Sequence, residues 1–431
     1  MFLFKQPPNL PRCSHRIVRL TESFRGNPAD TGISQVSSED ESNPNGFVLD
    51  ARSVQTIEDL SWLYRTARKH STSQAFRKPG GRVVIIRSCP TQIEEPESVA
   101  ASEAIVGFAK SLAKENGTRG ATVNLIRDAT PFNDAENALE KPLEWLLSHH
   151  SCYVTGQEIV VSANPRIPAE IVENRSILIS GAAGGIGRAT AKFLNTEQQP
   201  SSKLLLVDHP STQSKLDQVA VDLRATAPPQ RQVEVLPLDL TQADAGEILA
   251  QASADIGGLE RVIHAAGITR DKTLKNMDYE SAWKPVLEVN MGAAFKIDHA
   301  LLSTPGALLP TTTGNCGSSF VYFGSTSGIS GNAGQSNYAA SKSGLLGYAE
   351  AMAKRHPEHS FRVVSPGFID TDMTGKMPFL VRMVASKLNA LGQAGKPEDV
   401  AAAVAFLSSP EATGLAPGFH LRVCGMFMGG R

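Results

Sequence analysis

The sequence has few cysteines, almost no net charge and no long hydrophobic run. Five cysteines are scattered over 431 residues, too few for a disulfide framework or a paired-thiolate metal site, so a reducing, cytoplasmic compartment is expected. Lys and Arg number 42 against 43 Asp and Glu, which removes the positive charge expected of a nucleic-acid binder. The longest apolar run, Val400–Leu407, is far shorter than the ~20 residues of a membrane span.

The length predicts two domains or one large α/β unit, because ~150 residues make an average domain. Residues 1–45 are polar or interrupted by proline and predict an N-terminal arm and linker, with a transit peptide as the less favoured interpretation. Residues 46–168 contain β-branched runs and helical apolar spacing, which predict an α/β domain. Pro165 and Pro168 mark a linker, and a second β/α alternation occupies residues 174–431.

Two stretches of the first domain resemble two stretches of the second, in the same order. Ala100–Lys114 aligns on Ala339–Lys354, and Trp145–Val161 parallels Phe406–Val423. Any two helix-then-strand segments look somewhat alike, but two matches in one order favour a duplicated α/β unit.

A glycine-rich turn follows the first strand pattern of the second domain. Ser176–Ser180 leads directly into Gly181, Gly185 and Gly187, where glycine lets the backbone approach a pyrophosphate at a helix N-terminus. Asp208 ends the next strand, and a carboxylate there accepts hydrogen bonds from an adenosine ribose and repels a 2′-phosphate. NAD(H) is therefore favoured over NADP(H), with an ordinary loop-start carboxylate as the alternative interpretation of Asp208.

Tyr338 and Lys342 stand four residues apart in a helical pattern, so both point from one face. A phenol is a poor acid–base catalyst near neutral pH unless a cation stabilises the phenolate, and Lys342 can supply that charge. Ser325 ends the preceding strand pattern, where its hydroxyl can polarise a carbonyl oxygen. A Tyr–Lys pair alone would be better explained as an ordinary surface pair.

These motifs occur together in an order and spacing that resemble the short-chain dehydrogenase/reductase superfamily over residues 174–431. Within it, AGITRDKTLKNM, GNAGQSNYAASKSG and SPGFIDTDMTGKM are similar to 3-oxoacyl-(acyl carrier protein) reductases. The additional N-terminal domain and the C-terminal RVCGMFMGG resemble the high-molecular-weight members of that group. This resemblance implies a Rossmann-type doubly wound parallel sheet, preceded by a smaller, degenerate flavodoxin-like α/β domain, and a preference for NADH.

The resemblance also implies the roles of individual residues. The catalytic residues it implies are Asn290, Ser325, Tyr338 and Lys342, with Asn290 anchoring a proton-relay water. The cofactor contacts it implies are Gly181, Gly185, Ile186, Gly187, Asp208, Asp239, Leu240, Ala266, Gly267, Tyr338, Lys342, Ile369 and Thr371. No metal site is expected.

Several residues depart from the family pattern. His264 and Ala265 replace the usual Asn-Asn, which puts a strand-steadying hydrogen bond in doubt, and His264 is expected to be structural. Cys316 and His359 stand where carrier-protein reductases have arginine, so a coenzyme A thioester is as plausible a substrate as one on the acyl carrier protein. In the repeat, Glu103 corresponds to Lys342, so the first domain is expected to be catalytically empty and to pack, assemble or shape the substrate mouth.

The sequence therefore predicts an NADH-dependent 3-oxoacyl-thioester reductase of fatty acid metabolism, assembled as a homo-oligomer and more specifically a homodimer. Two alternatives remain: a dehydrogenase for another alcohol or ketone, and a dinucleotide-sensing protein without turnover. An apolar helix face from Phe379 to Leu391 is expected to be either a lid over an acyl chain or core packing.

Overall fold

A computed structural model describes most of the chain. It covers residues 19–23, 33–37, 46–72, 76, 79–89, 95–129, 135–162, 176–196, 203–228, 231–309, 317–371, 374, 379–409, 412 and 414–427, without the side chains of 19–23, 33–37, 135–137 and 379–382. The linker prolines Pro165 and Pro168, and Cys316, lie outside these ranges.

The second half of the chain forms a parallel seven-stranded sheet in the order β13-β12-β11-β10-β7-β8-β9. Its strands are β7 (Ser176–Ser180), β8 (Lys203–Asp208), β9 (Gln232–Pro237), β10 (Leu259–His264), β11 (Ser319–Phe323), β12 (Ser360–Pro366) and β13 (His420–Val423). Every residue of β7, β10, β11 and β12 is buried, as expected for parallel strands with both faces covered. The order reverses direction between β7 and β10, which creates the crevice where doubly wound sheets bind ligands.

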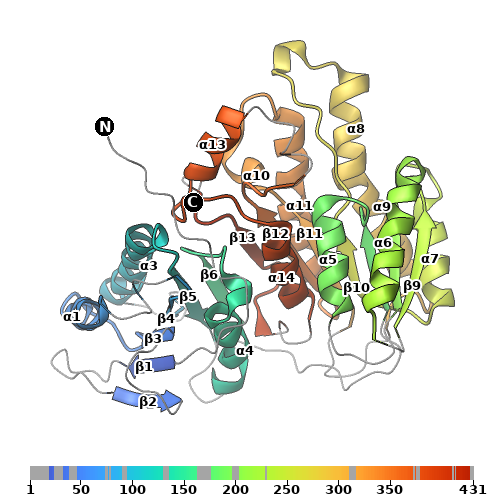
Figure 1. Cartoon of the computed structure of the whole chain (residues 1–431). Helices are drawn as coiled ribbons and strands as arrows, with labels where there is room; N and C mark the ends of the chain where they lie inside the picture. Colours follow the sequence, from blue (N-terminus) through green and yellow to red (C-terminus); the bar gives the residue numbers. More distant parts are fainter. Residues whose placement is uncertain are drawn as a thin grey trace.

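Helices cover both faces of this sheet (Figure 1). One face carries α5 (Gly185–Asn195), α6 (Gln213–Thr226) and α14 (Pro397–Ser408), and the other carries α7 (Ala245–Asp255), α9 (Ala293–Ser303) and α11 (Ser336–Arg355). The connecting helices are α8 (Lys284–Leu287), flanked by π-helical turns at Tyr279–Trp283 and Glu288–Gly292, α10 (Thr326–Ser330) and α13 (Phe379–Lys387). The expected doubly wound architecture is confirmed.

The first half forms a smaller six-stranded sheet in the order β2-β1-β3-β4-β5-β6. Its strands are β1 (Arg19–Ser23), β2 (Ile33–Ser37), β3 (Gly46–Asp50), β4 (Arg82–Ser88), β5 (Thr122–Asp128) and β6 (Glu158–Val161), and its helices are α1 (Leu60–His70), α3 (Pro96–Gly117) and α4 (Ala135–Leu147). Only β1 and β2 pair antiparallel. Helices α1 and α3 pack on one face and α4 on the other.

Two segments of the expected N-terminal arm are strands. Residues 19–23 pair in parallel with β3, and residues 33–37 pair with them as the edge of the sheet. The prediction of an arm was therefore wrong for these residues. Strand pairing is made by backbone groups, so it needs no apolar run, and these polar segments give no hydrophobic signal in the sequence.

The two halves share one hydrophobic core. Residues of α4 and β6 cluster with residues of α5, α14 and β13. The Trp145 ring stacks on the Phe406 ring with 4.5 Å between centroids and 10° between planes. Val161 forms an antiparallel bridge with Leu415. The halves are thus joined through the neighbourhood of their last strands, β6 and β13 (Figure 1).

The internal repeat is visible in this arrangement. Helix α3 precedes β5 as α11 precedes β12, and β6 and β13 are each the last strand of a sheet. Trp145 and Phe406, which begin the second pair of matched stretches, face each other across the junction. The two matched stretches therefore meet where the two halves join.

Candidate active site

A cavity of ≈ 220 Å³ lies at the carboxyl ends of the parallel strands in the second half. Its walls come from the turn after β7, the ends of β10, β11 and β12, and helix α11. This is the position where a doubly wound sheet leaves a crevice.

The turn after β7 holds its backbone close to neighbouring chain. Gly181 has φ of 68°, and a Cβ there would lie 2.6 Å from the backbone N of Ala266. A Cβ on Gly187 would collide with the carbonyl oxygen of Gly181. Because the next residues begin α5, the first amides of that helix point toward the cavity mouth. The turn therefore fits the pyrophosphate of a dinucleotide.

Asp208 stands beside this turn at the end of β8. One carboxylate oxygen accepts from the backbone N of Ala183 at 2.9 Å, and the other accepts from the backbone N of His209 at 2.7 Å and the Thr212 hydroxyl at 3.0 Å. Asp239 ends the next strand-to-loop segment, where hydrogen bonds from Thr241 lower the pKa of its carboxyl. Two carboxylates thus border the end of the crevice predicted for an adenosine ribose.

Ser325, Tyr338 and Lys342 line the same cavity. Ser325 follows β11 as the N-cap of α10, and its hydroxyl oxygen accepts from the backbone N of Ser327 at 3.1 Å. Tyr338 and Lys342 lie one turn apart on α11, as their spacing predicted. The Lys342 Nζ lies 5.7 Å from the centre of the Tyr338 ring and donates to the carbonyl oxygen of Phe323 at 2.8 Å.

Burial controls the pKa values of this pair. It lowers the pKa of the Lys342 ammonium to about 8. It also raises the pKa of the Tyr338 phenol, and a hydrogen bond with Ser325 opposes that rise. The expectation that Lys342 would lower the phenol pKa is not met here, because desolvation outweighs other effects and Lys342 is held on the Phe323 carbonyl. Tyr338 is therefore kept protonated and able to donate.

Asn290 is buried at the centre of the π-helical turn Glu288–Gly292. Its Oδ1 accepts from the backbone N of Ile268 at 2.7 Å, and its Nδ2 donates to the Ile268 carbonyl at 3.1 Å and to the Ser341 hydroxyl at 3.0 Å. The side chain thus ties the segment after β10 to α11. A Cβ on Gly267 would meet both Asn290 Oδ1 and Lys342 Nζ, so these groups converge on one point.

The cavity brings together most of the residues expected to bind a cofactor. Those lining it are Gly181, Gly185, Ile186, Gly187, Gly267, Ser325, Tyr338, Lys342, Ile369 and Thr371; Asp208, Asp239, Leu240, Ala266 and Asn290 lie outside its lining. The lining residues missed from the sequence are Gly184, Ala265, Phe323, Gly324, Pro366, Gly367 and Thr374. Most of the missed residues are sequence neighbours of predicted ones, so extending each motif by one or two residues would have found them.

A first-domain residue supports one cavity wall and was missed. The fully buried Tyr153 hydroxyl donates to the Gln393 carbonyl at 3.0 Å and approaches the Phe368 carbonyl at 3.4 Å. Phe368 precedes Ile369, which lines the cavity. The first domain therefore packs against the second half of the chain and holds part of its site.

His264 makes a side-chain hydrogen bond of its own in place of the strand-steadying hydrogen bond expected from the usual Asn-Asn pair. Its Nε2 lies 2.8 Å from Asp298 on α9, whose second oxygen accepts from the Tyr322 hydroxyl at 2.6 Å. The structural role expected of His264 is confirmed.

His359 is one of the two residues expected to replace an arginine of the carrier-protein reductases. It is buried before β12, at the end of the sheet away from the cavity, and its Nδ1 accepts from the backbone N of Ser318 at 3.0 Å. The substrate argument drawn from His359 stays a prediction.

Two further expectations met mixed outcomes. Met383, Val384 and Leu388 are exposed on and after α13, so core packing is wrong for these side chains, whereas Leu391 is buried. Glu103 is exposed on α3, and its carboxylate lies 3.0 Å from the Arg87 guanidinium. Within the described ranges no group of three or more His, Cys, Asp or Glu could hold a metal, and no described helix is long and apolar enough to cross a membrane.

Comparisons with known proteins agree with this geometry. The family model for short chain dehydrogenases matches residues 175–378. A 3-oxoacyl-[acyl-carrier-protein] reductase of Vibrio cholerae is 32% identical over 246 residues, covering 56% of this chain and 92% of the relative. The reductase of the same name from Thermotoga maritima is 34% identical over 245 residues, covering 56% and 93%. A human (3R)-3-hydroxyacyl-CoA dehydrogenase is 34% identical over 256 residues, covering 58% and 95%.

Proposed function

Because the chain belongs to the short-chain dehydrogenase family, we propose that it reduces 3-oxoacyl thioesters to 3-hydroxyacyl thioesters with NADH. The observation that carries this proposal is the convergence of Ser325, Tyr338 and Lys342 with the glycine turn in one cavity. The relatives named above act on 3-oxoacyl and 3-hydroxyacyl groups carried by acyl carrier protein or coenzyme A, which supports the substrate class.

The residues divide the work of moving one proton to a carbonyl oxygen. NADH held along Gly181, Gly185 and Gly187 would supply the hydride for the new C–H bond at C3 of the substrate. Tyr338 donates its phenolic proton to the oxygen, consistent with the raised pKa that keeps the phenol protonated. The Ser325 hydroxyl orients the same oxygen and hydrogen-bonds to the phenol. Lys342, with a pKa of about 8, contributes to the relay that restores the proton of Tyr338.

In our proposal, Asn290 positions Lys342 rather than transferring a proton itself. Its amide is engaged by Ile268 and Ser341, and Ser341 directly precedes Lys342 on α11. These hydrogen bonds therefore fix the position of Lys342 relative to the segment that follows β10. A relay water held near Asn290 would complete the four-residue arrangement.

The preference for NADH rests on Asp208. Its carboxylate borders the glycine turn through Ala183, where it would accept hydrogen bonds from the ribose hydroxyls and repel a 2′-phosphate. The neighbouring Asp239 adds a second negative charge.

Assembly and compartment complete the proposal. We propose a homodimer in the cytoplasm; the described cysteines Cys89, Cys152 and Cys424 are buried and form no disulfide with one another, which suits a reducing environment. Light scattering of the purified chain tests the dimer.

The central test uses the full chain with acetoacetyl-CoA and NADH, followed by absorbance of the reduced nicotinamide. Tyr338→Phe should lower turnover by about 10²–10⁴-fold, the usual contribution of general acid catalysis. Tyr64→Phe, at an exposed position on α1, is the matched control and should be unchanged. Near-normal turnover of the Tyr338 variant would show that the mechanism is wrong, and preference for a simple ketone over graded thioesters would remove the substrate assignment.

A further inference from the structure

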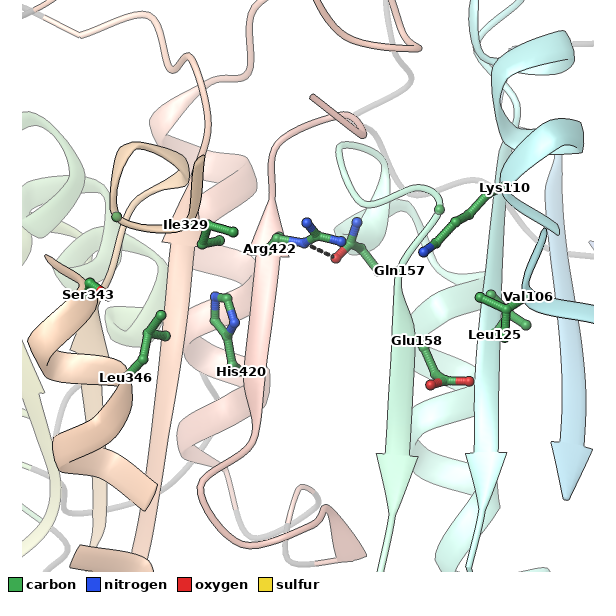
Figure 2. A pocket seen from close by; sticks show the side chains of 12 residues that line it. Val106, Lys110, Leu125, Gln157, Glu158, Ile329, Ser343, Leu346, His420 and Arg422 are labelled. Carbon is green, nitrogen blue, oxygen red and sulfur yellow. Dashed lines mark hydrogen bonds between the residues drawn. The ribbon is translucent and has the colours of Figure 1, made fainter. Parts of the chain in front are cut away.

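A second cavity, of ≈ 500 Å³, lies between the two halves of the chain and shares no lining residue with the first. One wall comes from α3, β5 and β6, and the other from α10, α11 and β13 (Figure 2). The walls are held in place by the shared core and by hydrogen bonds such as Ala416 N to the Val160 carbonyl at 2.9 Å. This cleft has the volume of a small-molecule site, for which ~300–1,000 Å³ is typical.

Two cations from opposite halves face each other across the cleft. Figure 2 shows the Lys110 ammonium and the Arg422 guanidinium pointing toward one another, with Gln157 between them. Arg422 Nε donates to Gln157 Oε1 at 2.9 Å. Lys110 makes no ion pair with any residue in the described part of the chain, so its charge is available to a ligand.

Glu158, the carboxylate among the lining residues, is already neutralised. Its Oε1 accepts from the Arg87 Nε at 2.6 Å, and its Oε2 lies 3.8 Å from Arg127. Arg87 also pairs with Glu103. The cationic side chains that line the cleft are therefore Lys110 and Arg422, while the carboxylate of Glu158 is held by Arg87 outside the lining. Two cations that face a shared space favour an anion between them.

His420 adds no further charge near neutral pH. Burial, with the neighbouring Arg422, lowers its pKa to about 4. The charged residues that line the cleft with it from other elements are Lys110 and Glu158. Its Nε2 lies 2.7 Å from the Ser365 hydroxyl, so the ring ties β13 to β12.

The cleft also offers apolar surface beside these charges. Val106 and Leu125 contribute it from the first half, and Ile329 and Leu346 from the second. A bare inorganic ion would leave this surface uncovered, whereas an anion with a short hydrocarbon chain would bury it.

The segments that form the floor of the cleft also carry Ser325 and Lys342. Gly328 lies on α10, whose N-cap is Ser325, and its backbone N donates to the Ser325 carbonyl at 3.0 Å. A Cβ on Gly328 would lie 2.9 Å from the backbone N of Ser343, the residue after Lys342. A ligand in the cleft would therefore press on the segments that position Ser325 and Lys342.

We propose that this cleft binds a small organic anion, with a carboxylate or phosphate head between Lys110 and Arg422 and a short apolar chain between the walls. Its occupation changes turnover at the catalytic residues on the other side of α10. The inference concerns a site separate from the proposed reaction, and its binding test does not depend on that reaction.

Calorimetry with octanoate and with octyl phosphate tests binding and separates the two head groups. Lys110→Gln should weaken binding by about tenfold or more, because a charge-assisted hydrogen bond is lost. Lys114→Gln, one turn farther along α3 and exposed, is the matched control and should bind normally. Val106→Trp should block the cleft, and inorganic phosphate and 1-octanol should each bind more weakly than the complete amphiphile.

Turnover of acetoacetyl-CoA with NADH provides the second measurement. The better amphiphile should change kcat without competing with the thioester, and the change should disappear in Lys110→Gln. No binding by either amphiphile at 10 mM, or binding unaffected by Lys110→Gln, would overturn the site. Competition with the thioester would place the ligand in the active site instead, and binding without any change in kcat would overturn the coupling.

Discussion

Asp208 offers the sharpest test of cofactor choice, through the substitution Asp208→Asn. Asparagine has nearly the same shape and keeps one oxygen acceptor, so the 2.9 Å hydrogen bond from the Ala183 backbone can persist. The substitution changes the charge, because Asp239 becomes the one carboxylate of this pair that remains at this end of the crevice. The glycine turn should therefore stay folded while its electrostatics change.

The expected magnitude follows from the loss of one charged acceptor. Hydrogen bonds to an ionised group contribute ~1.5–3 kcal/mol against ~0.5–1.5 kcal/mol for neutral pairs. The difference of ~1.4 kcal/mol corresponds to about a tenfold loss in kcat/KM with NADH. Removing a negative charge near a 2′-phosphate should give a gain of similar size with NADPH, because partial exposure screens the repulsion. The ratio of the two constants should shift by about 100-fold.

Initial rates with each cofactor, at a fixed concentration of acetoacetyl-CoA, measure this ratio. Thr212→Val is the control, because it removes the 3.0 Å hydroxyl contact to Asp208 without changing charge, and it should leave the ratio within about threefold. An unchanged ratio in Asp208→Asn would refute the assignment of Asp208 to the ribose. A wild-type chain that prefers NADPH would refute it without any variant.

Three other predictions follow from burial and backbone geometry. With a Lys342 pKa of about 8, the ammonium is lost as pH rises through that value, so kcat/KM, which reports the free enzyme, should fall above pH ~8; a flat profile to pH 10 would contradict this. Trp145→Ala should lower the free energy of unfolding by ~3–5 kcal/mol in one denaturant transition, against little change for exposed Met383→Ala; two separate transitions would disprove the shared core. Gly181→Ala, at φ 68° and against neighbouring backbone, should abolish NADH fluorescence enhancement, whereas Gly107→Ala, with open space around it, should not.

The sequence predicted the parts of the site that depend on local pattern. The glycine turn, the Tyr338–Lys342 pair and the position of Asp208 at a strand end all follow from residue type and spacing, and the structure places them as expected. Burial of Tyr338 and the direction of its pKa shift did not follow, because desolvation depends on the surrounding packing rather than on the neighbouring lysine.

Long-range pairing was the other gap. Strands β1 and β2 carry polar residues; β1 forms through backbone pairing with β3, and β2 through backbone pairing with β1. The contact of Tyr153 with the carbonyls of Phe368 and Gln393 spans more than two hundred residues and has no local signature. The hydrogen bond of His264 could be anticipated as structural, but its partner Asp298 could not.

The stacking of Trp145 on Phe406 has a consequence for how this chain can change over time. When identical subunits meet on a two-fold axis, every substitution at the interface occurs twice, so a clash or an improvement is always doubled. Here the two sides of the junction belong to one polypeptide and differ in residue type. Each side can therefore be altered alone, so the first half can change in sequence while it continues to pack against the second.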